Sequence, residues 1–238
     1  MNTAREARRR VPVALLALLA ASLAAQIAWK SAWQPAAPEA ADLPPAPAVA
    51  TLRLASLGEP EALSRLLMLY LQAFDFQAGN RLSYRQLDYE RLAGWLGALL
   101  ALDPRGQYPL FSAARIYADI SDPVRQRKML EFIYAEFFRD PNRRWPWLAH
   151  AALVAKHQLK DLALARKYAA ALDKSVTARD IPAWATQMEI FILEDMNELQ
   201  AAMLMIGGLV ASGRVTDPAE LRFLEGRLKE LEKRLNKR

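Results

Sequence analysis

The sequence predicts an all-α fold, built as an α-solenoid of antiparallel helical hairpins that follows one N-terminal transmembrane helix. Alanine, leucine, arginine and glutamate dominate the 238 residues, whereas only nine are glycine and β-branched residues are sparse. That composition favours helices. Asp-Pro dipeptides recur between apolar segments, and no segment shows the sustained period-two alternation that is typical of a sheet. We therefore expect short connections between successive helices.

Residues 1–30 are predicted to be a basic N-region followed by a transmembrane anchor. Several arginines precede an apolar run over residues 11–29. At about 1.5 Å per residue, a helix of this length approaches the roughly 30 Å hydrocarbon core of a bilayer. Because basic residues stay cytoplasmic, we expect a single pass through the bacterial inner membrane and a periplasmic body. The alternative is a cleaved signal peptide, since residues 22–24 offer a small-x-small cleavage site.

Residues 31–57 are predicted to be an Ala/Pro-rich linker. Five prolines between positions 34 and 50 exclude a long helix and favour extended, polyproline-like geometry. At about 3.1 Å per residue, such a tether could hold the body on the order of 50 Å from the bilayer.

The charge and the cysteine count exclude several classes of protein. The formal net charge is +6, but five basic residues and one acidic residue lie in residues 1–30, which leaves +2 for the rest. A nucleic-acid surface needs a concentrated basic face, and none stands out, so we expect no nucleic-acid partner. Because the chain has no cysteine, disulfides and thiolate metal sites are excluded.

Residues 58–238 are predicted to form the helical domain. Aspartate can cap a helix by accepting from its free N–H groups, and proline at the first helical position loses no hydrogen bond. Asp-Pro occurs at 103–104, 122–123, 140–141 and 217–218. Short connections make sequential helices pack antiparallel. The predicted helices are 59–75, 83–102, 107–120, 123–139, 145–158, 161–174, 182–195, 197–212 and a C-terminal capping helix, 218–236.

One segment, residues 147–173, resembles a tetratricopeptide repeat: it has small residues on its first helix, a tight turn at 160–161, and Ala165, Tyr168 and Ala169 on its second. Residues 98–104, ALLALDP, resemble the end of such a repeat. The order LDP, RWPW, IPAW and a terminal DPAELRFLEGRLKELEKRL is similar to a group of membrane-anchored bacterial tetratricopeptide-like proteins. The resemblance implies a curved, tetratricopeptide-like solenoid whose concave side binds a peptide or a partner helix.

Tryptophans and histidines are the first candidate partner-binding residues: Trp145, Trp147, His150, His157 and Trp184. Clustered aromatic residues often anchor partners, although their rings can also fill the seams between neighbouring hairpins. The two histidines share a helix face about 10.5 Å apart along its axis. Histidines that share one metal ion on a helix are usually four residues apart, so we expect no metal site here.

A leucine stripe on the last helix is the second interaction signal. Its members follow a 3-4-3-4 spacing: Leu221, Leu224, Leu228, Leu231 and Leu235. With these at the a and d positions, the flanking charges complement each other as in a coiled coil. The stripe either caps the end of the solenoid or mediates self-association or docking of a partner helix.

These patterns favour binding over catalysis. We find no nucleophile motif, phosphate loop or glycine-rich fingerprint, so we expect neither an enzyme nor a cofactor. We expect a membrane-anchored, periplasm-facing scaffold for protein–protein interaction or assembly in the cell envelope, with an unknown envelope protein as its partner.

Two alternatives stay open. The first is a helical envelope enzyme that acts on cell-wall glycans, with His150, His157, Glu194 and Glu198 around one concave pocket. The second is a structural protein that self-associates through residues 218–238.

Overall fold

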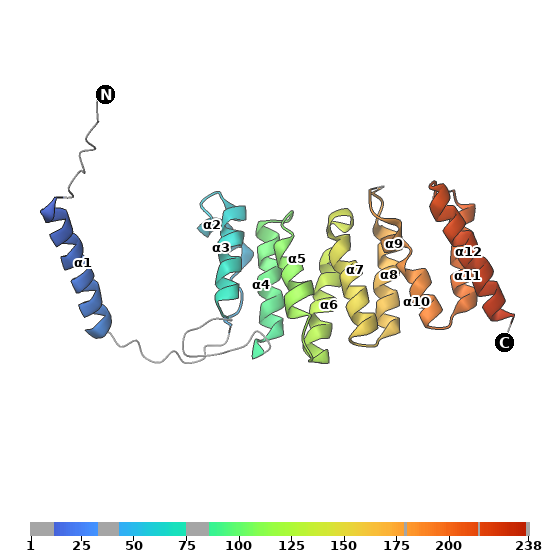
Figure 1. The fold of residues 1–238 in the computed structure, drawn as a ribbon, viewed down its shortest axis with the longest axis horizontal. Helices are drawn as coiled ribbons and strands as arrows, with labels where there is room; N and C mark the ends of the chain where they lie inside the picture. The colour runs from blue at the N-terminus through green and yellow to red at the C-terminus, as the bar shows by residue number, and fades with distance from the viewer. Residues whose placement is uncertain (1–11, 33–42, 75–85, 179, 214, 237–238) are drawn as a thin grey trace, which may run out of the picture.

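The structure, a computed structural model, describes residues 12–32, 43–74, 86–178, 180–213 and 215–236. Within these ranges every regular element is a helix, which confirms the predicted all-α class. From α2 to α12 the helices stand side by side in a row, and their order along the row follows the sequence (Figure 1).

Most helices pack against their neighbours in the sequence. The contacts of α7 with α8 are the most extensive, and α3 packs on α4, α6 on α7, α10 on α11, and α11 on α12. The elements of the row are α2 (Val49–Ala55), α3 (Pro60–Ala73), α4 (Tyr89–Leu102), α5 (Tyr108–Ser112), the π-helical turn η3 (Ala113–Tyr117), α6 (Pro123–Phe137), α7 (Pro141–His157), α8 (Leu162–Ser175), α9 (Ala183–Thr186), α10 (Met188–Asp195), α11 (Leu199–Ala211) and α12 (Pro218–Leu235).

The first helix, α1 (Val13–Ala32), is different in kind. It is mostly apolar, with Lys30 in its last turn, and its side chains that the structure describes are all exposed. Residues 13–31 are long and apolar enough to cross a membrane.

The helical row begins earlier in the sequence than predicted. Within the predicted linker, Leu43 is fully buried and α2 packs on α4. Two side chains of α4 hold this entry segment: Arg91 Nη1 donates to the Leu43 carbonyl at 2.9 Å, and Trp95 Nε1 donates to the Pro44 carbonyl at 2.8 Å. The rest of the predicted tether, residues 33–42, lies outside the described residues. At about 3.5 Å per residue, it spans at most about 40 Å between Ala32 and Leu43, less than the reach predicted for the whole linker.

Only two of the four Asp-Pro dipeptides cap a helix as predicted. Asp122 and Asp217 cap α6 and α12 as predicted, because their carboxylates accept from backbone N–H groups of the first turn. Asp103 instead directly follows the last residue of α4, at the C-terminal end of that helix. Asp140 lies at the start of α7, but its carboxylate accepts from Arg143 Nε at 3.1 Å instead of capping the helix.

The apolar core divides at α10. One large cluster extends from Leu43 through α3–α8 to Met188 and Ile192 of α10. A second cluster joins Ile190 and Leu193 of α10 to α11 and α12. Because α10 is buried on both of these faces, it links the end of the row to the main body.

A buried arginine ties three parts of the main body together. Arg144 of α7 is only 2% exposed. Its Nη1 donates to both the backbone carbonyl and Oε2 of Glu136 on α6, at 2.7 Å each. Its Nη2 donates to the carbonyl of Pro104, in the connection between α4 and α5, at 3.1 Å. The first turn of α7 is thereby fixed against both α6 and the α4–α5 connection.

We expect Arg144→Met to lower the free energy of unfolding by about 3 kcal/mol, because a buried carboxylate loses its main partner. Arg139, 3.5 Å from Glu136, remains nearby and limits the loss. The matched control is Arg143→Met, which removes a more exposed ion pair with Asp140 and should change stability by less than about 1 kcal/mol. Chemical denaturation of the full chain in detergent, followed by circular dichroism, measures both. Equal, small effects would contradict the assigned role of Arg144.

Candidate partner-binding surface

Three adjacent, partly exposed aromatic rings lie on α5 and α7. The Tyr108 and Phe111 rings stack with their centroids 5.8 Å apart, and Trp147 meets the Phe111 ring edge-on, also at 5.8 Å. Tyr108 is 48% exposed and Phe111 is 36% exposed. We call Tyr108, Phe111 and Trp147 the aromatic surface.

Helical spacing brings the aromatic surface together. Tyr108 and Phe111 are three residues apart, and Arg115 follows four residues later, so all three fall on one side of α5 and η3. On α7, Trp147 and His150 are likewise three residues apart. In η3, the Ala118 N–H reaches the Ala113 carbonyl at 2.9 Å, a π-type bond of the kind that often occurs at functional sites.

Polar contacts hold two of the rings in place. The Gln72 side chain of α3 donates to the Tyr108 hydroxyl. Trp147 Nε1 donates to Gln107 Oε1 at 2.6 Å. Each contact joins different elements, so the rings are positioned before any partner arrives.

His150 extends the surface and is half-buried beside a cation. Arg115 Nη1 lies 3.4 Å from His150 Nδ1. A guanidinium only donates, so this contact requires a neutral imidazole whose Nδ1 accepts. Burial lowers the pKa of His150 below its ordinary value of about 6.5, and the charge of Arg115 lowers it further. The Ala114 carbonyl and the Asp119 carboxylate act in the opposite direction.

An apolar groove of about 450 Å³ adjoins the aromatic surface between α3 and α5. Its size falls within the range of ligand pockets, roughly 300–1,000 Å³. Met68, Leu69 and Pro109 supply apolar walls, and Arg65, Gln107 and Tyr108 supply polar groups. We call this feature the α3–α5 groove.

A second pocket, of about 480 Å³, lies between the starts of α4 and α6 and is lined mainly by charged residues. Those charges are largely matched within the chain. Lys128 pairs with Glu90, and Arg127 pairs with Asp161 at 2.8 Å. This pocket is therefore better explained as an ion-pair network between helices than as a binding site.

The five tryptophans and histidines predicted to bind a partner do not form one site. Trp147 contacts Phe111 of α5, and His150 contacts Arg115 of η3. Trp145 instead contacts Trp184 of α9, with ring centroids 5.7 Å apart, and this pair joins α7 to α9. His157 is exposed at the C-terminal end of α7.

The α5 half of the surface was not predicted from the sequence. Tyr108, Phe111 and Arg115 share a helix face, and that spacing is visible in the sequence. Their partners on α7 are not, because Gln107 and Trp147 lie 40 residues apart.

The leucine stripe of α12 is packed within the chain. Leu224 and Leu231 are buried in the second apolar cluster, and Leu221, Leu228 and Leu235 pack against it. The stripe therefore lies on α10 and α11 in this structure.

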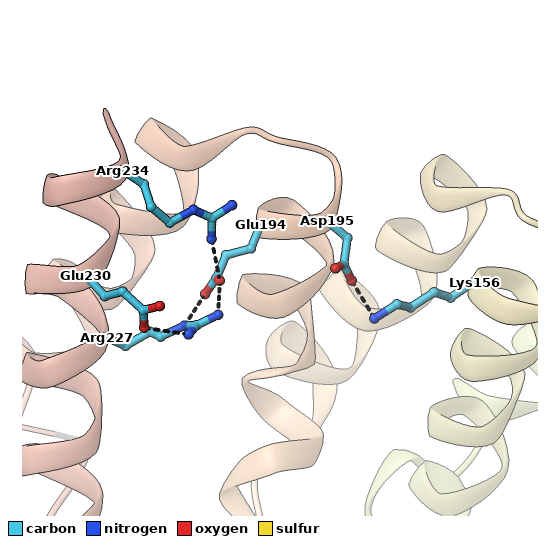
Figure 2. A network of polar contacts seen from close by, with 6 residues as sticks. All are labelled: Lys156, Glu194, Asp195, Arg227, Glu230 and Arg234. Carbon is cyan, nitrogen blue, oxygen red and sulfur yellow. Dashed lines mark hydrogen bonds and ion pairs between the residues drawn. The ribbon is translucent and has the colours of Figure 1, made fainter. Parts of the chain in front are cut away.

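The residues of the alternative catalytic site make contacts in different places. Figure 2 shows that Glu194 points toward Arg227 and Arg234 of α12, whereas Asp195 points toward Lys156 of α7. His150 contacts Arg115 of η3, and Glu198 is exposed at the start of α11. Across the part of the chain that the structure describes, no group of three or more His, Asp or Glu residues is placed to hold a metal ion.

Comparison with known proteins identifies no relative. No protein-family model, curated protein or solved structure matches the chain. Function is therefore inferred from the residues and their geometry.

We expect Glu194→Gln to lower the free energy of unfolding by about 1–3 kcal/mol, because two arginines of α12 lose an ionised, buried partner. The Glu194 side chain is 5% exposed, against 45% for its neighbour Asp195. Asp195→Asn is the matched control and should cost less than about 1 kcal/mol. Urea unfolding of the two variants tests this difference, and a larger effect of Asp195→Asn would overturn it.

The lowered pKa of His150 predicts that acid destabilises the fold through this residue. The folded state disfavours the imidazolium, so the contribution of His150 is fully present above about pH 6.5 and declines below it. We expect His150→Gln to flatten the dependence of unfolding free energy on pH between about 7 and 5. His157→Gln, at the exposed end of the same helix, is the control that should keep the wild-type slope. Unchanged slopes in both variants would refute the assignment.

Proposed function

We propose that the chain is a membrane-anchored, periplasm-facing scaffold with a tetratricopeptide-like solenoid body, which binds another protein of the bacterial cell envelope through the aromatic surface. The observation that carries this proposal is the set of three adjacent, partly exposed aromatic rings, two of them fixed by polar contacts with α3 and the α4–α5 connection.

The order of the helices supports a solenoid body. In solenoids each helical pair contacts mainly its neighbours in the sequence, and the row from α2 to α12 follows this rule. The α7–α8 hairpin, which carries the tetratricopeptide resemblance, closes through Lys160 in a left-handed conformation with φ of 55°. Asp161 then caps α8 by accepting from the Leu164 N–H at 2.9 Å.

The properties of α1 support a membrane anchor. Its 20 residues span about 30 Å, and it exposes apolar side chains along its whole length. The arginine-rich start of the chain favours a cytoplasmic N-terminus and therefore a periplasmic row of helices.

The character of the aromatic surface supports protein binding. Aromatic side chains are enriched among the few residues that carry most of the energy of protein interfaces. Because Gln72 and Gln107 already hold the rings, little side-chain entropy is lost when a partner binds. The neighbouring α3–α5 groove adds a recess for an apolar side chain.

The proposal is tested by cross-linking in intact cells, followed by pull-down of the tagged full chain from solubilised membranes. We expect one envelope protein at a near-equal amount. The Phe111→Ala/Trp147→Ala double variant should recover at least about tenfold less of it, because truncating one such anchor typically costs 2 kcal/mol or more.

The control is Phe223→Ala, which removes an exposed phenylalanine from α12 and should leave recovery unchanged. Circular dichroism confirms that each variant is folded. Full recovery of the partner by the double variant would exclude the aromatic surface. Recovery of the chain alone would favour self-association instead.

A further inference from the structure

Exposed leucines gather on the first helical pair of the row. Among the residues that the structure describes, six leucines of the row are exposed, and four of them belong to this pair: Leu54, Leu57, Leu66 and Leu69. Leu54, in the last turn of α2, is 81% exposed, and Leu57, in the turn between α2 and α3, is 93% exposed. We call Leu54 and Leu57 the leucine tip. Single exposed apolar side chains are normal, whereas a group of them indicates a contact.

The two ends of the helical row are built differently. The last helix, α12, buries its leucines and exposes mainly charged residues, among them Arg222, Glu225, Lys229, Glu232 and Lys233. This is the usual end of a solenoid, whose outer face has to be polar. The α2–α3 pair at the other end exposes leucines instead. Its surface is therefore suited to an apolar neighbour.

The backbone holds the leucine tip in an unusual conformation. Leu57 has φ of 50°, a left-handed value that is unfavourable for a bulky side chain, and Gly58 follows with φ of 96°. Backbone hydrogen bonds fix the turn, since the Ser56 N–H donates to the Leu52 carbonyl and the Glu59 N–H donates to the Ser56 carbonyl, each at 2.9 Å. Because the Leu57 side chain is almost fully exposed, it adds little to the fold. A contact outside the chain explains a leucine at this position.

The bilayer is the apolar phase that lies closest to the leucine tip along the chain. The helix α1 is long and apolar enough to cross a membrane, and it ends at Ala32. The span from Ala32 to Leu43 is at most about 40 Å. From Leu43 to Leu57, six residues outside any helix and the seven residues of α2 cover at most about 30 Å. The leucine tip can therefore reach the bilayer surface at which α1 ends.

The charges around the leucine tip are balanced. Arg53 and Arg65 are basic, Glu59 and Glu61 are acidic, and all four are exposed. Arg53 Nη2 also donates to the Ala101 carbonyl of α4 at 3.4 Å. A balanced surface is only weakly attracted to anionic headgroups. Any attraction to lipid therefore has to come from the leucines.

We propose that the leucine tip inserts into the surface of the bilayer that holds α1. Leu54 and Leu57 enter the boundary between headgroups and acyl chains, and the row gains a second attachment to the membrane. Because α1 keeps the tip at a high local concentration near the lipid, two leucines suffice for the contact. This inference rests on the proposed function, since it requires α1 to be the anchor. It adds that the body is oriented on the membrane instead of moving freely on its tether.

The test measures the contact with lipid directly. The chain has no cysteine, so one introduced cysteine takes a fluorescent label. Ala55→Cys, at the exposed end of α2, is labelled with nitrobenzoxadiazole, and the full chain is placed in phosphatidylcholine nanodiscs that contain lipids with a nitroxide on the acyl chain. We expect strong quenching of this label. The matched control is Ala211→Cys, another exposed alanine that ends a helix, where we expect little quenching.

Leu54→Gln/Leu57→Asn is the decisive variant, combined with the label at position 55. We expect the ratio of inserted to detached chains to fall about tenfold or more, because burial of each leucine is worth on the order of tenfold. Asparagine adopts the left-handed conformation readily, so the fold is retained, which circular dichroism checks. Leu204→Gln removes an equally exposed leucine from α11 and should change nothing. Raising the salt from about 0.05 to 0.5 M should also leave the quenching unchanged.

The outcomes separate this inference from the proposed function. If the chain stays in the nanodiscs but lipid does not quench the label at position 55, the inference fails and the anchor stands. A chain that elutes apart from the nanodiscs removes the anchor and both proposals with it. Protection of the label from aqueous iodide without quenching by lipid would show that protein covers the leucines and would overturn the inference. Equal quenching at position 211, or quenching that salt abolishes, would overturn it as well.

Discussion

The buried guanidinium of Arg144 fixes the geometry on which the rest of the body depends. It joins the end of α6 to the connection before α5, and three residues later Trp147 reaches that same connection through Gln107. The first two turns of α7 are thus held to the 104–107 segment at two points. The contact between Trp147 and Phe111 follows from these ties, so a buried structural ion pair sets the position of an exposed surface.

Polar ties of this kind recur along the row. Arg127 reaches Asp161 between α6 and the start of α8, Arg166 reaches Glu189 between α8 and α10, and Arg227 reaches Glu194 between α12 and α10. In a row of helices each element has few neighbours, so apolar packing alone gives little resistance to the sliding of one helix along the next. Directional contacts at successive junctions supply that restraint. The aromatic surface lies on α5 and α7, inside the row and away from its C-terminal end.

Local rules made much of the fold predictable from the sequence. The helix predicted at 123–139 is found as α6 because Asp122 caps it and Pro123 occupies its first position. Rules of the same kind misplaced the start of α7, since Pro146 lies inside the helix instead of near its beginning. Contacts between residues far apart in the sequence could not be predicted. The burial of Leu43 depends on Arg91 and Trp95, about 50 residues away, and only the tertiary structure pairs Trp147 with α5.

The capture of the entry segment by α4 has a mechanical meaning. With α1 held in a bilayer and a partner held on α5 and α7, tension between them would not pass first along the backbone of α2 and α3. It would enter at the Leu43 and Pro44 carbonyls and pass through the side chains of Arg91 and Trp95 directly into α4. The α2–α3 pair would thereby carry less of the tension, and α4, which packs on both α3 and α6, would receive it.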